Sequence, residues 1–263
     1  MITDFHTHAF PDSMAERAIR TLESETDKAV AHLDGRVSSL LASMDKAGIG
    51  RSVVCSIATK PTQFDRILEW SKQIASERII PFPSVHPQDP EALLHIRQIA
   101  EAGFKGIKLH PYYQKFVMDA PDMFPIYEEI CRQNLMLVCH TGFDISFPRD
   151  RIVDPRRIAR VAEAFPTLKL VTTHLLSWDD WDEVERHLLG KPVYTDFSMT
   201  IAFIGGERTR AMLLTHPREY VLFGTDSPWQ DQSEEMARFR ALGLGPQWEQ
   251  AVLSDNASRL LGS

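Results

Sequence analysis

The chain has 263 residues, of which 43% are hydrophobic and 25% charged, a composition typical of a globular protein with enough apolar side chains for a large core. Its formal net charge is −7 and its Lys and Arg residues form no basic cluster, which argues against a nucleic-acid backbone as the main partner. Three cysteines without C-x-x-C spacing do not predict a disulfide framework. The N-terminus has no signal-peptide pattern and no run approaches about 20 apolar residues, so we expect a cytoplasmic protein without a membrane segment.

Short apolar runs alternate with longer stretches of helical spacing along the chain. In chain order, the runs that predict strands are residues 2–5, 52–57, 79–86, 104–110, 135–140, 168–174, 193–197 and 220–226. The stretches that predict helices are residues 12–48, 64–75, 90–102, 125–133, 155–164, 179–189, 206–215, 231–242 and 246–261. The segments 111–124, 141–154 and 198–206 carry no recognisable motif and are interpreted as loops.

The order of these segments predicts the fold. Eight strands that alternate with helices predict parallel β/α units. Eight strands close a barrel, and about 250 residues is an ordinary length for one. We therefore predict an α/β protein with a (β/α)8 TIM-barrel fold, a single domain over residues 1–263. An open doubly wound sheet is the alternative, but no G-x-G-x-x-G turn follows the first strand.

Histidines mark the ends of the predicted strands. Six of the ten histidines lie there, and two aspartates lie at or near the ends of the last two strands: His6, His8, His86, His110, His140, His174, Asp196 and Asp226. Active sites of such barrels lie at the C-terminal ends of the strands. Residues two apart in a strand project from one face, so His6 and His8 can lie side by side. The pattern predicts one polar site to which several strands contribute.

Neutral imidazoles together with a carboxylate suit a divalent transition metal, and a catalytic centre leaves a position open for water. Metal binding lowers the pKa of that water to about 7, which supplies hydroxide at neutral pH. A further histidine or aspartate can move protons beside it. We expect one divalent ion, zinc first and manganese as the alternative, and the histidine set also allows a second ion.

Several motifs resemble those of the amidohydrolase superfamily, in particular the amidohydrolase-2 branch of metal-dependent TIM-barrel hydrolases and decarboxylases. They are Asp4-Phe5-His6-Thr7-His8, Gly106-Ile107-Lys108-Leu109-His110-Pro111, His140-Thr141-Gly142, Thr173-His174, Gly224-Thr225-Asp226-Ser227-Pro228 and the tail Asp255-Asn256-Ala257-Ser258-Arg259-Leu260-Leu261. The resemblance runs over nearly the whole chain. It implies that the metal is bound by His6, His8, His140 and Asp226. It also implies that His174 acts in the second sphere or binds a second metal, and that Asp226 can serve as general base.

Three further residues are candidates for substrate binding. His110 and Lys108 are two apart, so both can face the same side of their strand. Some branches of the superfamily bridge two metals with a lysine at this strand, whereas a buried ion pair and a partner for a substrate carboxylate are the other interpretations of Lys108. Asp196 either binds substrate or braces a loop. His86 is interpreted as structural and Cys139 as a small core residue.

The leading functional prediction is a metal-dependent hydrolase of a small ester, lactone or amide. The closest alternative is a non-oxidative decarboxylase of a small aromatic or unsaturated carboxylic acid, which the resemblance also implies. The compact chain favours hydrolysis, because decarboxylases of this branch tend to be longer. A TatD-type nuclease is third, since that group has a glutamate near Lys108 and His110, and a non-catalytic scaffold is last. We expect a small-molecule substrate, no nucleic acid or membrane partner, and a homodimer as the default oligomer.

Overall fold

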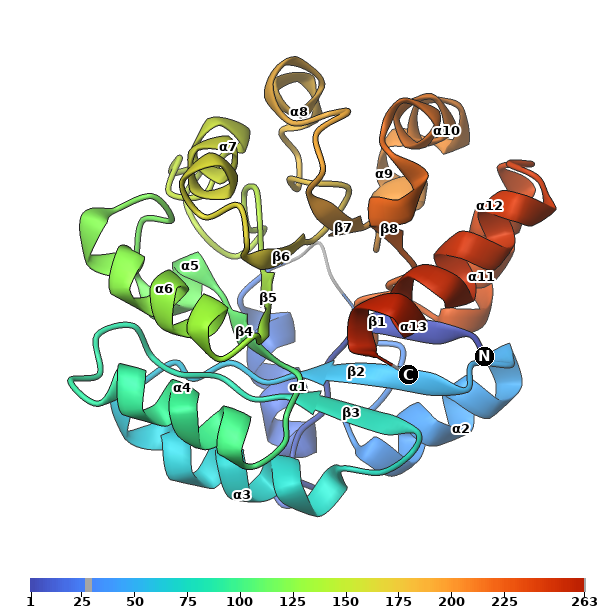
Figure 1. The fold of residues 1–263 in the computed structure, drawn as a ribbon. Coiled ribbons are helices and arrows are strands. Elements are labelled where there is room, and N and C mark those ends of the chain that lie inside the picture. The colour runs from blue at the N-terminus through green and yellow to red at the C-terminus, as the bar shows by residue number, and fades with distance from the viewer. Residues whose placement is uncertain (27–29, 263) are drawn as a thin grey trace. The chain divides into compact units, whose positions relative to one another are not determined.

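The structure, a computed structural model, describes residues 1–26 and 30–262 (Figure 1). Residues 27–29, which fall within the predicted helical stretch 12–48, and residue 263 lie outside the described residues. The strands are β1 (Thr3–Thr7), β2 (Arg51–Cys55), β3 (Ile79–Phe82), β4 (Gly106–Leu109), β5 (Met136–Cys139), β6 (Lys169–Thr172), β7 (Tyr194–Asp196) and β8 (Val221–Leu222). Each overlaps one predicted strand.

Helices follow the strands along the chain. They are α1 (Ala15–Ser24), α2 (Val37–Ala47), η1 (Pro61–Gln63), α3 (Phe64–Ile74), α4 (Ala92–Glu101), α5 (Pro111–Gln114), η2 (Pro121–Met123), α6 (Phe124–Arg132), α7 (Pro155–Ala164), α8 (Trp181–His187), α9 (Thr200–Ile204), α10 (Gly206–Thr215), η3 (Arg218–Tyr220), α11 (Gln232–Ala241), α12 (Pro246–Gln250), η4 (Ala251–Asp255) and α13 (Asn256–Leu261). The alternation of strands with helices is therefore as predicted.

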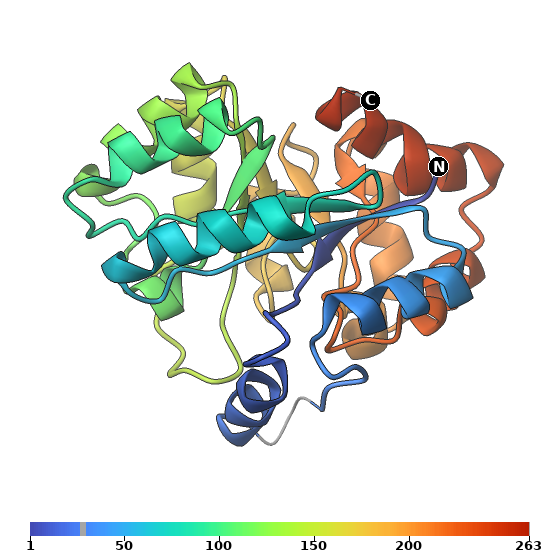
Figure 2. The same cartoon turned by 90° about the horizontal axis from the view of Figure 1, so that it is seen from below.

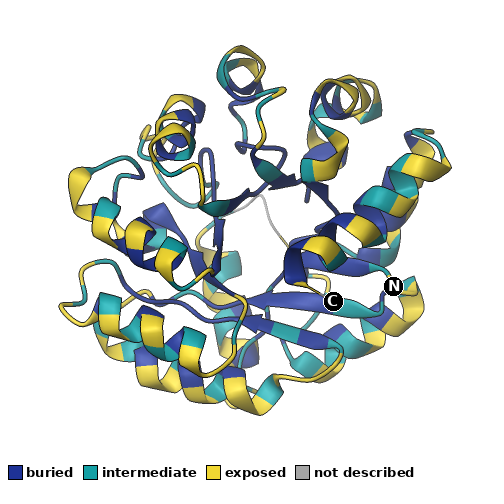
Figure 3. Ribbon diagram, in the orientation of Figure 1, coloured by how far each residue is buried: buried dark blue, intermediate teal, exposed yellow. Residues whose placement is uncertain are grey.

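The chain divides into two compact units. Unit 1 consists of Met1–Val54, Ser76–Ile80 and Gly190–Ser263, and unit 2 consists of Cys55–Ala75 and Pro81–Leu189. In each unit the strands are almost wholly buried, whereas the helices alternate between buried and exposed residues (Figure 3). Burial on both faces of a parallel sheet explains why the strands read as continuous apolar runs in the sequence.

Unit 1 places the first and last strands beside each other. β1 lies parallel to β2, and β7 lies parallel to β8. The backbone N–H of Phe5 in β1 donates to the carbonyl oxygen of Phe223, the residue after β8, at 2.8 Å. Phe223 is fully buried with Phe197 and Phe239, and α11 packs against α2 (Figure 2). The ends of β1 and β8 therefore rest on an aromatic core.

Unit 2 contains a parallel sheet in the order β4, β5, β6. In its register Ile107 lies opposite Leu137, and Leu137 lies opposite Leu170. Gly106 begins β4 where a Cβ atom would lie only 2.3 Å from Cε2 of Phe82. A larger residue at position 106 would push the Phe82 ring away, so glycine allows β4 to pack there.

Two segments that the sequence predicts to be loops contain short helices. Pro111 begins α5, because proline at the first helical position loses no hydrogen bond and already has a helical φ. Met199, in the left-handed conformation, precedes α9 and offers no side-chain cap, so the sequence carries no start signal there. The predicted helix 246–261 is α12, a π-helical turn and α13 in succession.

None of the three cysteines forms a disulfide, which confirms that prediction. Cys139 is buried, as its predicted core role requires, and burial raises the pKa of its thiol to about 12. Among residues 1–26 and 30–262, no helix has both the length and the apolar character needed to span a bilayer.

Candidate metal centre

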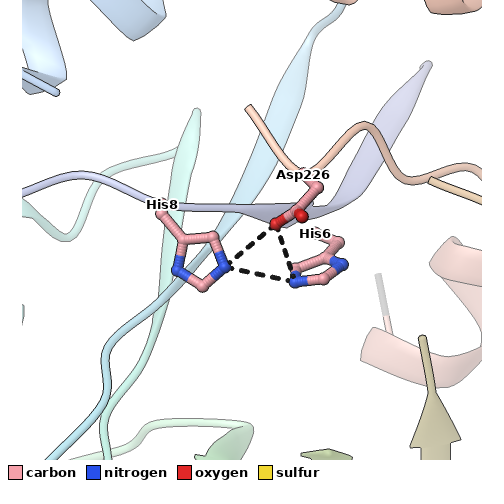
Figure 4. Close-up of side chains that lie close together, drawn as sticks. All are labelled: His6, His8 and Asp226. Atoms are coloured by element: carbon pink, nitrogen blue, oxygen red, sulfur yellow. Dashed lines mark hydrogen bonds and ion pairs between the residues drawn. The ribbon is translucent and has the colours of Figure 1, made fainter. Parts of the chain in front are cut away.

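His6 and His8 lie side by side at the end of β1. His6 belongs to the strand and His8 follows it by one residue, so the two side chains project from the same face, as predicted. Their Nε2 atoms are 3.2 Å apart, and both point toward the carboxylate of Asp226 (Figure 4). Asp226 Oδ1 lies 3.3 Å from His6 Nε2 and 3.2 Å from His8 Nε2.

Asp226 reaches this position through the turn that follows β8. Its φ is +59°, in the left-handed region, and its backbone N–H donates to the carbonyl oxygen of His6 at 2.8 Å. The next residue, Ser227, accepts a 2.6 Å hydrogen bond from the backbone N–H of His8. At Gly224 a Cβ atom would lie 2.7 Å from Cβ of Asp196 and 3.1 Å from Cβ of His6. Glycine therefore lets the turn approach β1 closely.

The three ligand atoms form a nearly equilateral triangle with sides of 3.2–3.3 Å. Nitrogen and oxygen ligands at about 2.0–2.1 Å from one tetrahedral ion are separated by about 3.3 Å. All three side chains are largely buried, and two imidazoles with one carboxylate suit a divalent transition metal. His6, His8 and Asp226 therefore fit one divalent ion.

Asp196 supports His6 from behind. Its Oδ2 lies 3.1 Å from His6 Nδ1, the ring nitrogen opposite the triangle. Its Oδ1 accepts hydrogen bonds from the backbone N–H and the hydroxyl of Ser198, at 2.9 and 2.6 Å. A carboxylate on Nδ1 fixes the proton there and leaves Nε2 to face a metal. The prediction that Asp196 contacts substrate is not tested by this geometry and stays a prediction.

Two other buried carboxyl groups of unit 1 have altered acidity. Burial raises the pKa of Asp4 in β1 to about 7, although four hydrogen bonds act in the opposite direction. Burial likewise raises the pKa of Glu235 in α11 to about 7, with Arg238 opposing the shift and the negative charges of Asp4 and Asp196 adding to it. The buried carboxyl groups of Asp4, Asp196 and Glu235 therefore lie close enough together in unit 1 for their charges to interact.

His140, the fourth ligand that the sequence predicts, lies in unit 2 in a second group of possible ligands. Its Nε2 is 3.8 Å from Asp144 Oδ2, and His110 Nε2 is 3.3 Å from the same oxygen. The His110 and His140 rings stack with centroids 4.2 Å apart and planes within 10°. Lone pairs of parallel rings lie in parallel planes and do not converge on one point. This second group therefore fits one ion less well than the triangle does.

Aromatic rings surround the histidines of unit 2. Tyr113 contacts His110 edge-on at 4.8 Å, and Phe147 lies 4.9 Å from Tyr113. His174 lies 5.2 Å from His140 and 5.3 Å from Trp178, measured between ring centroids. This cluster of imidazole and aromatic rings in unit 2 is hereafter the aromatic cluster.

His174 has a left-handed backbone conformation, with φ of +56°, and two left-handed residues follow it. The indole N–H of Trp181 donates to the carbonyl oxygen of His174 at 3.1 Å and stabilises this turn.

Tyr112 is an aromatic residue of unit 2 with altered acidity. Burial, together with the nearby charges of Asp144 and Asp150, raises the pKa of Tyr112 to about 12. The Tyr112 hydroxyl donates to the carbonyl oxygen of Asp150.

The remaining predicted residues have simple surroundings. Lys108 is fully buried in β4, and its backbone carbonyl accepts a 2.7 Å hydrogen bond from Ser84. His86 accepts a 3.2 Å hydrogen bond from the backbone N–H of Gln88, which agrees with a structural role, and burial lowers its pKa. Asp144 and Ser198 were not singled out from the sequence. Asp144 follows His140 by four residues in a segment without a motif, and Ser198 has no distinguishing neighbour.

Comparisons with known proteins give a consistent result. The family model described as amidohydrolase matches residues 3–263. The chain is similar in structure to an uncharacterized TIM-barrel protein from Bordetella bronchiseptica, with 20% identity, a TM-score of 0.79, and coverage of 99% of this chain and 98% of that chain. A search among curated proteins finds no match.

Two decarboxylases are also similar in structure. For 5-carboxyvanillate decarboxylase from Sphingomonas paucimobilis the identity is 15%, the TM-score 0.73, and the coverage 99% of this chain and 98% of that chain. For the enzyme of the same name from Novosphingobium aromaticivorans, with bound manganese and a nitrobenzoic acid, the identity is 16%, the TM-score 0.73, and the coverage 100% and 97%. These likenesses confirm the predicted TIM-barrel fold class. Together with motifs at the strand ends and a family match over residues 3–263, they lead to one conclusion: the chain belongs to the amidohydrolase family, in its amidohydrolase-2 branch.

Proposed function

We propose that the chain is a divalent-metal-dependent, non-oxidative decarboxylase of a small aromatic carboxylic acid. The observation that carries this proposal is the structural likeness to two 5-carboxyvanillate decarboxylases over 97% or more of each chain. The likeness to the Sphingomonas paucimobilis enzyme takes in 99% of this chain and 98% of that chain, so it is not confined to a part of either. Hydrolysis, the leading prediction from the sequence, therefore becomes the alternative.

The metal would be held by His6, His8 and Asp226, whose ligand atoms have suitable separations. A divalent cation held there would supply positive charge that stabilises negative charge on the substrate. Manganese is the first ion to test, because the decarboxylase from Novosphingobium aromaticivorans contains it. That His140 completes this ligand set stays a prediction, which the metal content of a His140→Ala variant would test.

Decarboxylation breaks the bond between a ring carbon and the carboxylate, releases carbon dioxide, and leaves the electron pair on the carbon, which then takes a proton. Asp226 is the proposed proton donor, because one oxygen of its largely buried carboxyl group, Oδ1, belongs to the triangle and the other can carry a proton. After each turnover, solvent would restore the proton on Asp226.

The aromatic cluster supports an aromatic substrate. Imidazole and phenyl rings offer flat faces and edges against which another ring can pack. His110 and Lys108 remain the proposed partners of the anionic group of the substrate. Lys108 is fully buried in β4, and a lysine side chain can donate a charge-assisted hydrogen bond to a substrate carboxylate.

The test is carbon dioxide release from hydroxy- and methoxybenzoates by the manganese-loaded protein in D2O. A decarboxylase gives a product with one deuterium on the carbon that lost its carboxylate. Asp226→Asn should slow this release by a factor of about 10²–10⁴, whereas Asp12→Asn, a change of the same kind at an exposed carboxylate, should leave it unchanged. Hydrolysis of esters or lactones without carbon dioxide release from any of these acids would overturn the proposal in favour of the hydrolase.

A further inference from the structure

The Asp4 carboxylate is enclosed completely in unit 1, two residues before His6. Its Oδ1 accepts hydrogen bonds from the backbone N–H of His6 at 3.2 Å and from that of Thr225 at 3.0 Å. Its Oδ2 accepts from the Thr225 hydroxyl at 2.6 Å and from the side-chain amide of Gln232 at 2.7 Å. One buried carboxylate therefore receives four donors.

Three of these four donors belong to the two segments that carry the ligands. His6 is itself a ligand on β1, and Thr225 immediately precedes Asp226 in the turn after β8. The Thr225 hydroxyl also accepts a 3.1 Å hydrogen bond from the backbone N–H of Ser227, so both neighbours of Asp226 are held through Asp4. Asp226 itself has a left-handed conformation, with a φ of +59°. If these hydrogen bonds are lost, we expect the backbone of Asp226 to move toward a negative φ.

We propose that Asp4 is a positioning residue that sets the separation between His6 and Asp226, and so the affinity of the metal centre. This inference rests on the metal centre of the proposed function. The hydrogen bonds that Asp4 accepts come from the backbone of His6, from Thr225 and from Gln232, so it acts on the triangle through β1 and the turn. Gln232, the first residue of α11, extends the same network to a helix.

The network allows a test by exchange of donor and acceptor. Asp4→Asn keeps the shape of the side chain but removes its negative charge and one acceptor oxygen, so the Thr225 hydroxyl and the Gln232 amide must turn to accept from the new amide. Gln232→Glu alone places two carboxylates in contact. The double variant has a donor at position 4 and an acceptor at position 232, so their hydrogen bond is kept in the reverse direction and the network regains its negative charge.

In the double variant the negative charge moves from position 4 to position 232, where the helix can accommodate it. That residue lies in the first turn of α11, where the helix dipole favours a negative charge. Gln232 Oε1 has no hydrogen-bond partner within the described residues, so the second oxygen of a glutamate there would leave no new donor unsatisfied.

The experiment is calorimetric titration of metal-free protein with Mn2+ at pH 8, together with the melting temperature of each metal-free protein. We expect Kd to rise about 10- to 100-fold in Asp4→Asn and to rise in Gln232→Glu. The double variant should return to within about threefold of the wild type. Asp12→Asn, at an exposed position, should bind as the wild type does.

Three results would overturn the proposal. One is an unchanged Kd in Asp4→Asn with a lowered melting temperature, which would make Asp4 structural only. Another is a double variant that binds no better than Asp4→Asn. Wild-type protein that binds no Mn2+ would instead remove the metal centre on which the proposal rests. If Asp4→Asn does not fold, Thr225→Val removes one of the four donors, and its Kd should rise several-fold by the same reasoning.

Discussion

In the proposed function, Asp226 acts both as a metal ligand and as the proton donor. Its Oδ1 lies within 3.3 Å of both histidines of the triangle. Asp226→Asn keeps the shape but removes the charge and the transferable proton. We expect kcat to fall by a factor of about 10²–10⁴ and the Kd for Mn2+ to rise. Steady-state kinetics at saturating Mn2+ separate the two effects, and an Asp226→Asn protein with unchanged kcat would show that another group moves the proton.

The role of Asp196 can be determined by comparing its effect on the Kd for Mn2+ with its effect on KM. If it fixes the Nδ1 proton of His6, Asp196→Asn should raise the Kd for Mn2+ about 10- to 100-fold and leave KM nearly unchanged at saturating metal. Ser198→Ala, which removes one donor to Asp196, should have a smaller effect of the same kind. The opposite outcome, a raised KM with unchanged metal affinity, would favour the substrate-binding role that the sequence suggests.

Some site residues are recognisable from the sequence because local geometry alone brings them together. His6 and His8 are two apart in a strand, and strand geometry puts them on one face. Asp4 shares that face, but its role depends on Thr225 and Gln232, which are more than 200 positions away in the chain. No local pattern indicates such a contact.

At the scale of elements, the turn after β5 depends on one glycine. Gly142 has a φ of +91°, and a Cβ atom there would lie 2.0 Å from the backbone nitrogen of Trp178. Gly142→Ala must displace the 177–178 backbone, so we expect a loss of more than about 3 kcal/mol in the free energy of unfolding. Gly245, with a φ of +92° and no atom within 4 Å of the added Cβ, is the matched control.

In Gly245→Ala only backbone strain lowers the free energy of unfolding, by about 1–3 kcal/mol. Urea denaturation of both variants gives the comparison. Equal losses in the two proteins would mean that the contact with Trp178 gives way without cost.

Glu235 in α11 makes stability depend on pH. Its pKa is raised from 4.5 to about 7, so between these values the folded state binds more protons than the unfolded state. The free energy of unfolding therefore falls as pH rises through that window. Glu235→Gln removes this contribution, which is about 3 kcal/mol between pH 4.5 and pH 8.

Urea denaturation of metal-free protein at pH 5 and pH 8 measures this effect. We expect the loss of stability between the two pH values to be smaller in Glu235→Gln than in the wild type. Asp4 contributes in the same direction in both proteins, so some dependence remains. Parallel curves for the two proteins would contradict the assignment to Glu235.

The elements that the sequence predicts well are those with strong local signals. The apolar runs of β4, β5 and β6 and the helix that ends at Gly48 follow directly from periodicity and from a left-handed glycine. The short helix α5 has only Pro111 as a local start signal, and α9 has none. The strand β8 has two residues where the sequence suggests seven, since residues 223–226 already form the turn that presents Asp226.

For the whole molecule, the fold class is easier to predict than the chemistry. Eight alternations of strand and helix allow few arrangements, and the TIM barrel is confirmed. Hydrolysis and decarboxylation, in contrast, are both compatible with the histidines and the aspartate that the sequence singles out. Asp144 shows the limit of local patterns, because it lies in a segment without any motif and yet contacts His110. Folds host many reactions, and the site decides between them.

The most direct test of the central claim is metal content per chain, measured by elemental analysis after loading with Mn2+ and removal of excess ion. We predict about one ion per chain in the wild type and in His110→Ala, and a loss of the ion in His8→Ala. This pattern follows from the triangle of His6, His8 and Asp226 and from the parallel stacking of His110 on His140. A wild-type protein without metal, or an ion that is lost in His110→Ala and kept in His8→Ala, would contradict it.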